Sequence, residues 1–183
     1  MAQGHMTDSS TNSFGEIVEP NNEHLHQMVE IFKDAQNYHH DSFPEIFSDI
    51  NNSDDERTAI ENYLQGYFKP GFSFRNKRRS NFSYAIVSNN IVHGYLLYNL
   101  KKSSDIFFGK DRWSCFVEDI ATAESYRGKG VASRLIDRLM TEIADLENCR
   151  ISAQVWRGNN SSIKLFEKFG FDQKSSVLYR TLK

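Results

Sequence analysis

The chain has 183 residues, close to the roughly 150 of one typical domain, and its 39% hydrophobic and 25% charged residues predict an ordinary soluble globular fold. Its 22 basic and 24 acidic residues give a net charge of −2, which argues against nucleic acid or an anionic membrane as the main partner. No apolar run approaches the roughly 18 residues of a membrane span. Two cysteines cannot form a disulfide framework, so we expect a protein of the reducing cytoplasm.

The N-terminal residues 1–13 are polar and have no apolar core of a secretory signal. Residues 1–6 read as a cloning remnant before a second start at Met6, and residues 7–13 as a frayed tail. We therefore expect a single folded domain over residues 14–183.

Hydrophobic periodicity and turn signals predict ten elements in the rest of the chain. In order they are a strand at 14–19, a helix capped by Asn21 or Asn22 and broken by the run 38–44, a helix between the capping box 53–56 and Pro70-Gly71, strands at 82–86 and 91–97 joined by a tight turn at Asn89-Asn90, a strand at 113–122, a helix at 130–145, a strand at 150–155, a helix from Asn159 to Gly170, and a strand at 177–182.

This order predicts an α/β (α+β) fold with a mixed, mostly antiparallel sheet of about six or seven strands and about four flanking helices. A helix that joins two neighbouring strands acts as a crossover, so the strands at 113–122 and 150–155 are expected to run parallel.

The loop that opens the helix at 130–145 carries the most informative chemistry. Gly128 and Gly130 can adopt backbone angles that a Cβ forbids, so several N–H groups can turn toward one point. The helix N-terminus adds unpaired N–H groups and a partial positive charge, and Arg127 and Lys129 add side-chain charge. These features predict a phosphate site. The dinucleotide fingerprint fits poorly because Ser133 occupies its third glycine position, and a P-loop is absent. A connector that binds nothing is the alternative.

The residues Arg127, Gly130 and Ala132 match the pattern [QR]-x-x-G-x-[GA], and here the sequence resembles the GCN5-related N-acetyltransferase (GNAT) superfamily. Residues 118–122 are similar to that family's fourth strand, and 159–171 to its N-x-x-A-x-x-L-Y-x-K-x-G-F segment. The resemblance covers about residues 82–183. The stretch that begins at Glu118-Asp119 is also similar to the diamine and polyamine (spermidine/spermine-like) branch.

The resemblance implies transfer of the acetyl group of acetyl-coenzyme A to a primary amine, of a small molecule or a protein, by direct attack in a ternary complex without a metal. It also implies the residues that hold the coenzyme. These are the pyrophosphate loop Arg127, Gly128, Lys129, Gly130, Val131, Ala132 and Ser133, the pantetheine-aligning backbone of Ile120, Ala121 and Thr122, and Asn159, Ser162 and Phe166 on the far side. The Ile120 N–H is expected to point at the thioester oxygen.

Glu118 is the candidate catalytic residue, because a carboxylate can attract a protonated amine and take its proton directly or through water. Strand alternation predicts that Glu118 shares a face with residues 120 and 122 while Asp119 points the other way, unless a bulge intervenes. An exposed strand carboxylate without a catalytic role is the alternative. Tyr38 and Phe43, with Phe47, are expected either to line the acceptor cleft or to pack in the core.

One departure from the family concerns Phe166, which stands where many members carry a tyrosine that protonates the leaving sulfur. Water, Ser161 or Tyr179 are the alternatives for that step. The departure also supports a second hypothesis, a non-catalytic domain that binds acyl-coenzyme A as a sensor or scaffold. A nucleotide-binding α/β domain is a third.

The remaining polar clusters predict no further site. The histidines at 24, 26, 39 and 40 are expected to be surface or cleft residues and not metal ligands, since positions two apart on a helix do not share a face. Cys115 and Cys149 are expected to be buried thiols without a catalytic task. The basic loop 75–79 is expected to be solvated or to meet an anion, and a homodimer is possible.

Overall fold

The computed structural model describes residues 15–48, 50, 53–68, 80–103 and 112–180. Five strands form one sheet in the order β1-β2-β3-β4-β5, in which only the β4-β5 pair is parallel. The elements are β1 (Glu16–Val18), α1 (Asn22–Ser42), α2 (Asp54–Gln65), β2 (Ser80–Ser88), β3 (Ile91–Ser103), β4 (Arg112–Thr122), the 3₁₀ turn η1 (Glu124–Tyr126), α3 (Val131–Glu142), β5 (Arg150–Ala153) and α4 (Asn160–Lys168). The mixed, mostly antiparallel sheet with four helices confirms the predicted fold class, with five strands in the described residues where six or seven were expected.

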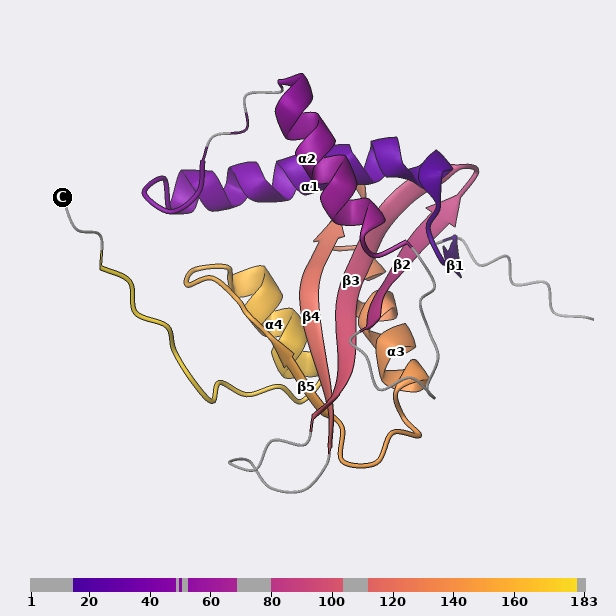
Figure 1. Ribbon diagram of the computed structural model, residues 1–183, viewed down its shortest axis with the longest axis vertical. Helices are drawn as coiled ribbons and strands as arrows, with labels where there is room; N and C mark the ends of the chain where they lie inside the picture. The colour runs from indigo at the N-terminus through magenta and orange to yellow at the C-terminus, as the bar shows by residue number, and fades with distance from the viewer. Residues whose placement is uncertain (1–14, 49, 51–52, 69–79, 104–111, 181–183) are drawn as a thin grey trace, which may run out of the picture.

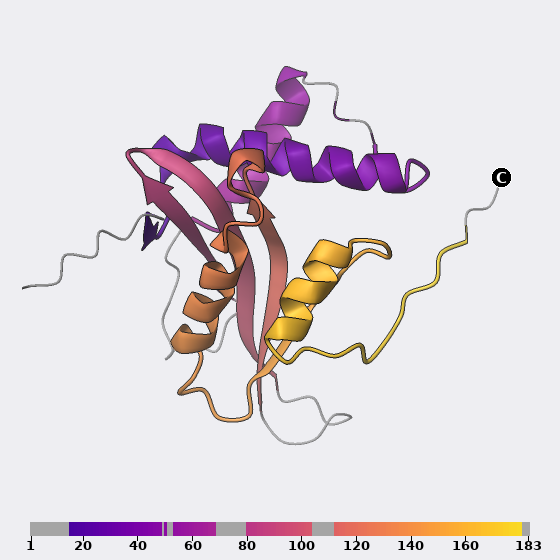
Figure 2. The same ribbon diagram turned by 180° about the vertical axis from the view of Figure 1, so that it is seen from behind.

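Helices cover both faces of the sheet (Figures 1 and 2). The central strand β3 divides its side chains between two hydrophobic cores because successive residues of a strand point to opposite faces. Tyr95 and Leu97 pack with α1 and α2, whereas Leu96 and Tyr98 pack with α3 and with Phe166 of α4. The sheet therefore separates an α1/α2 side from an α3/α4 side.

The helix α1 is longer than predicted. Its cap is Asn21, whose side chain accepts a hydrogen bond from the Glu23 N–H. The helix continues through Tyr38 to Ser42, although the sequence predicted a break from residue 38. Only Pro44 forces the end, because proline disfavours helical backbone angles in the residue before it, and that residue, Phe43, has φ −146° and ψ 64°.

Two predicted turn devices are confirmed. Asn89 and Asn90 join β2 to β3 with φ of 48° and 62°, the two positive values that a type I′ hairpin turn requires. Ser53 and Glu56 form the capping box of α2, each side chain bonding to the other residue's backbone N–H. The helix then ends at Gln65, and the predicted stop at Pro70-Gly71 lies outside the described residues, as does the basic loop 75–79.

The predicted strand at 177–182 is wrong over its described part, since residues 171–180 form no helix or strand. After α4 this segment runs along the outside of the molecule (Figures 1 and 2). Its alternating apolar residues meet no ladder partner there, and Val177, Leu178 and Tyr179 are all well exposed. An alternating pattern forms a strand only where a neighbouring strand offers its hydrogen-bonding groups. Residues 181 and 182 lie outside the described part.

Shortening a leucine in α3 tests how firmly this helix is attached to the sheet. Leu135 has 0% exposure and packs in the α3/α4 core. We expect Leu135→Ala to lower the free energy of unfolding by about 2–5 kcal/mol, the usual cost of such a cavity. Leu178→Ala is the matched control, because Leu178 is 91% exposed. This substitution should change the free energy of unfolding by less than about 0.5 kcal/mol. Urea denaturation measures both, and equal losses would contradict the assigned packing.

Candidate active site

A cleft of about 920 Å³ opens where β4 and β5 part from each other. The parallel pairing stops at Val117 and Ala153, and β4 continues to Thr122 paired with β3 alone. Beyond that point no strand of the described residues lies beside the edge of β4 that faces β5. The cleft extends along this edge from the loop before α3, past β4, to the side chains of α1 and α2.

One end of the cleft is a cradle of backbone N–H groups. Gly128 and Gly130 have φ of 73° and 82°, and Gly130 is the N-cap of α3. Among the described residues no side chain caps this helix, so the N–H groups of its first turn face the cleft lined by Val131, Ala132 and Ser133. A Cβ built on Gly130 would meet no atom within 4 Å, which shows that the space above the loop is open. This geometry can hold an anion.

Side-chain cations surround the cradle. Arg127, Lys164 and Lys168 line the cleft, and the Lys168 amine lies 3.3 Å from the Ser133 hydroxyl, which links α4 to the first turn of α3. The predicted Lys129 is placed differently: it is not among the lining residues, and its amine lies 5.4 Å from the centre of the Tyr126 ring. The positive charge at this end therefore comes from α4 as well as from the loop.

The start of α4 forms the side of the cleft opposite the β4 edge. The Asn159 side chain caps the helix by accepting from the Ser162 N–H at 3.1 Å, and it also accepts from the Ser161 hydroxyl at 2.8 Å. All three residues line the cleft. Phe166 also lines it, is 6% exposed and packs on Phe171 at 5.1 Å between ring centroids.

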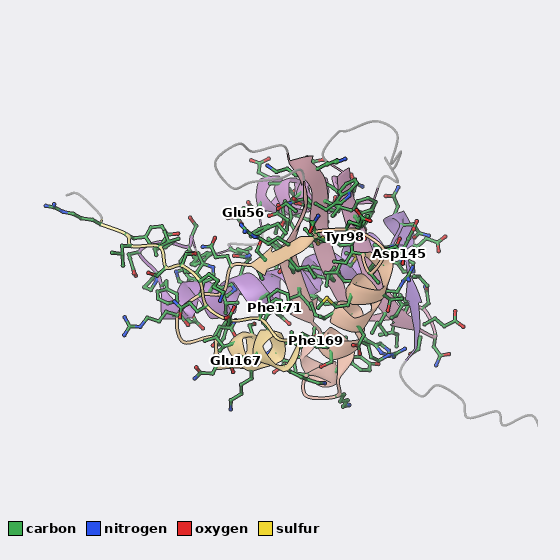
Figure 3. The ribbon with its side chains drawn as sticks, turned by 90° about the horizontal axis from the view of Figure 1, so that it is seen from below. Glu56, Tyr98, Asp145, Glu167, Phe169 and Phe171 are labelled. Atoms are coloured by element: carbon green, nitrogen blue, oxygen red, sulfur yellow. The ribbon has the colours of Figure 1, made fainter. Side chains whose placement is uncertain are left out.

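The chain turns back just past this helix, and Phe169 and Phe171 lie beside it (Figure 3). The Phe171 N–H bonds to the Phe166 carbonyl oxygen at 3.1 Å, which fixes the turn. Phe166 is therefore held as a buried apolar residue, and it has no proton to give at the cleft.

A bulge in β4 changes which way its two acidic side chains point. The register pairs Leu97 with Asp119 and Tyr98 with Val117, so Glu118 is an extra residue. Glu118 accepts a hydrogen bond from the Asn99 side chain, and Asp119 accepts one from the Tyr95 hydroxyl at 2.7 Å.

Both hydrogen-bond donors lie on the same face of β3, the one that carries α1 and α2. The expectation that Glu118 and Asp119 point to opposite faces is therefore wrong, because the extra residue shifts the alternation by one. Ile120 packs against the other core, on the α3/α4 side, and does not share a face with Glu118.

Asp119 has an unusual environment for a carboxyl group. Burial raises its pKa to about 6, and hydrogen bonds from the Tyr95 hydroxyl and the Ile120 N–H oppose that rise. Burial also raises the pKa of the Tyr63 hydroxyl, an effect that the negative charge of Asp119 strengthens. Asp119 and Tyr63 both line the cleft, so it contains a carboxyl that changes charge near neutral pH.

Aromatic side chains form the other end of the cleft. Tyr38, which is 48% exposed, and His39 come from the last turns of α1, and Phe47 from the segment that follows. Trp156 comes from the loop after β5 and meets Phe47 with ring centroids 4.7 Å apart. Phe43 does not line the cleft and instead packs against Trp156 at 5.6 Å.

The structure thus brings almost all the residues predicted from the sequence to one cleft, with Lys129 and Phe43 outside its lining. Tyr179, a candidate proton donor, is also outside it and stacks on Trp156 at 5.8 Å. The sequence analysis missed Asp119, Tyr63 and Lys168 as lining residues. A half-buried aspartate beside a tyrosine is a pattern of side-chain contacts, and the sequence held no signal for it apart from the neighbouring Glu118.

The described residues outside this cleft offer no metal-binding cluster and no reactive thiol at Cys115. Within the described ranges, no three His, Cys, Asp or Glu side chains gather closely enough to hold a metal ion. Cys115 is fully buried, and burial raises the pKa of its thiol to about 12. None of the helices in the described part of the chain has both the length and the apolar character needed to cross a bilayer.

Comparison with known proteins identifies the family. A model of the acetyltransferase (GNAT) family matches residues 25–171, and the chain belongs to this family. All the residues that line the cleft lie within the matched range. A search of curated proteins finds no match.

Solved structures share the fold at low sequence identity. A mutant of the BH1408 protein from Bacillus halodurans has a TM-score of 0.73 and 14% identity, covering 92% of this chain and 99% of that one. The ribosomal-protein-alanine N-acetyltransferase from Brucella melitensis biovar Abortus 2308 has a TM-score of 0.60 and 14% identity, covering 92% and 99%. An aminoglycoside acetyltransferase from an uncultured soil metagenomic sample has a TM-score of 0.59 and 13% identity, covering 94% and 99%.

Proposed function

We propose that this protein is an acetyl-coenzyme A-dependent N-acetyltransferase that acts on a primary amine, either a small amine or a protein amino group. The observation that carries the proposal is the charge arrangement of one continuous cleft. An uncapped helix N-terminus with Arg127 and Lys168 lies at one end, and Glu118 and Asp119 lie on the strand between this end and α1 and α2. The first end suits an anion and the carboxylates suit a cation.

The residues present fit the coenzyme. The open space above Gly130 and the N–H groups of Val131 to Ser133 would hold its diphosphate, with Arg127 and Lys168 adding charge. The edge of β4 beyond Val117 would pair with the pantetheine arm as an added strand does, and Asn159 and Ser162 would contact its far side. When bound, acetyl-coenzyme A supplies an acetyl group activated as a thioester. In this structure the Ile120 N–H is directed at the Asp119 carboxyl, so its role toward the thioester oxygen remains a prediction.

The two carboxylates of β4 would prepare the amine. A primary amine is mostly protonated near neutral pH and must lose a proton before its nitrogen can attack. Glu118 and Asp119 both face the α1/α2 side of the cleft, where together they would attract the ammonium group. Glu118 would accept the proton, directly or through a water molecule, and Tyr95 keeps Asp119 in place beside it.

No tyrosine is needed to release the leaving sulfur. A thiol has a pKa of about 8.5, so it can depart as the thiolate near neutral pH without a strong acid. Phe166 gives no proton, whereas the Ser161 hydroxyl lines the cleft and would donate to the sulfur in place of its hydrogen bond to Asn159. Attack would be direct, because Cys115 is buried in the α3/α4 core, where it is not a nucleophile.

Thiol release from acetyl-coenzyme A with a panel of primary amines tests the proposal. We expect release above background with at least one amine, and thermal stabilisation by coenzyme A but not by ATP or NAD. Tight binding of the coenzyme with no release across the panel would favour the sensor hypothesis, which Phe166 supports. Stabilisation by a nucleotide alone would favour the third hypothesis. Cytoplasmic location and homodimer formation stay predictions from the sequence.

The pH dependence of turnover should report Asp119. Its carboxylate, with a pKa near 6, helps attract the ammonium, so kcat/KM should rise as pH increases through about 6. Tyr95→Phe removes the hydroxyl that donates to the Asp119 carboxylate and favours its charged form. The pKa of Asp119 should therefore rise, and the increase of kcat/KM with pH should move to higher pH. Rates measured from pH 5 to 9 check both statements. An acidic limb that stays in place in Tyr95→Phe would exclude Asp119 as its origin.

A further inference from the structure

Several side chains that line the cleft beyond the two carboxylates are aromatic. We call His39, Phe47 and Trp156 the aromatic wall, since all three line the cleft and contact one another. His39 stacks on Phe47 with ring centroids 5.3 Å apart, and Trp156 lies 4.7 Å from Phe47 and 6.4 Å from His39. The wall joins the end of α1 and the segment after it to the loop between β5 and α4, which lies below the end of α1 in Figures 1 and 2.

Negative charge is confined to one place in the cleft. The lining residues from α1, α2 and the segment after α1 are Phe32, Ala35, Gln36, Tyr38, His39, Phe47 and Tyr63. None of these is acidic, and within the described residues the carboxylates of the lining are Glu118 and Asp119 alone. Burial lowers the pKa of His39, which disfavours its charged form.

We infer that the acceptor is a primary amine attached through a short chain to an aromatic or other flat apolar group. Its ammonium group meets Glu118 and Asp119, and its apolar group packs against the aromatic wall. This inference rests on the proposed function and narrows its acceptor. The negative charge of Glu118 and Asp119 determines where the ammonium group binds. Aromatic side chains bind another ring through offset or edge-on contacts.

Two other acceptor types fit the described walls less well. A linear polyamine would place a second ammonium group several carbons from the first, against a surface without a carboxylate. At this surface the second ammonium group would lose its hydrating water, and contact with a ring face offsets only part of that cost. An amino sugar would bring hydroxyl groups to the ring faces of the aromatic wall, whereas the polar lining residues Gln36, Tyr38, Tyr63 and Gln154 lie outside that wall. An apolar group that moves from water onto this surface contributes favourably to the binding free energy.

Calorimetry on the protein saturated with coenzyme A tests the inference without turnover. The probes are 2-phenylethylamine, 1,6-diaminohexane as a doubly charged amine of similar length, and glucosamine. We expect the Kd of 2-phenylethylamine to be at least tenfold lower than that of either other amine. Equal or tighter binding of 1,6-diaminohexane or glucosamine would overturn the inference.

Substitutions in the wall locate the binding. Phe47→Leu and Trp156→Leu keep an apolar residue but remove the ring, and each should raise the Kd of 2-phenylethylamine at least fivefold while the Kd of coenzyme A is unchanged. Phe82→Leu is the matched control, since Phe82 stacks on Tyr98 at 5.0 Å in β2 and does not line the cleft. Thermal melts confirm that each variant is folded. An unchanged Kd in both wall variants would also overturn the inference.

Turnover separates this inference from the proposed function. If 2-phenylethylamine binds as expected but no amine releases the thiol, the acceptor site stands and the enzymatic proposal fails. If a different amine is acetylated while 2-phenylethylamine does not bind, the enzyme stands and the aromatic acceptor fails.

Discussion

Replacing Gly130 with glutamate is expected to raise the Kd of coenzyme A more than about 100-fold, a loss of about 2.7 kcal/mol of binding free energy. The space above Gly130 is open, so the new side chain would occupy the cradle and not clash with the protein. Its carboxylate would stand where the diphosphate must lie, at the positive end of α3. The new carboxylate would repel the negatively charged diphosphate, and it would itself accept hydrogen bonds from the N–H groups of the cradle.

Backbone strain must be separated from this effect. Gly130 has φ of 82°, a value that costs about 1–2 kcal/mol for a residue with a Cβ. Gly170→Glu is the matched control, because Gly170 has φ of 79°, has open space around its Cα and does not line the cleft. It should show a similar loss of stability but an unchanged Kd. Calorimetry gives the Kd and thermal melts the stability. Wild-type affinity in Gly130→Glu would refute the assigned cradle.

Replacing Glu118 with glutamine is expected to lower kcat at least about 100-fold, the usual contribution of a positioned general base. The amide can keep the contact with Asn99 but carries no charge and accepts no proton. The Kd of coenzyme A should change less than about twofold, because the cradle lies at the other end of the cleft.

The contrast between turnover and coenzyme affinity makes this prediction specific. A structural role for Glu118 would lower stability and both constants together, which melts and calorimetry of the variant would reveal. Equal rates of the two proteins from pH 6 to 9 would remove Glu118 from the chemistry and leave Asp119 as the acidic group of the site.

The cradle could be predicted from the sequence because all its parts are local. Gly128, Gly130 and the first turn of α3 are neighbours in the chain, and glycine at these points permits the positive φ values that the loop adopts. The capping box of α2, the Asn89-Asn90 turn and the parallel β4-β5 pair were predictable for the same reason. Each depends on residues a few positions apart or on a short crossover.

The opposite end of the cleft depends on contacts between distant segments. His39 and Phe47 meet Trp156 only because α1 continues to Ser42 and brings them over the loop after β5. The sequence assigned Phe47 equally to core or cleft, since hydrophobic periodicity is the same in both. It likewise predicted a strand at 177–182 from alternation, a pattern that does not reveal whether a partner strand is near.

What the sequence determined by itself was the order of the elements as far as α4 and the positive-φ glycine turn before α3, because propensities, caps and glycine backbone angles act over a few residues. What only the tertiary structure decided was the direction of the two β4 carboxylates. A single extra residue at Glu118, defined by the register against β3, turns Glu118 and Asp119 to the same face. Register comes from pairing between strands, and burial from the packing of α1 and α2 above them, so neither is contained in the local sequence of β4.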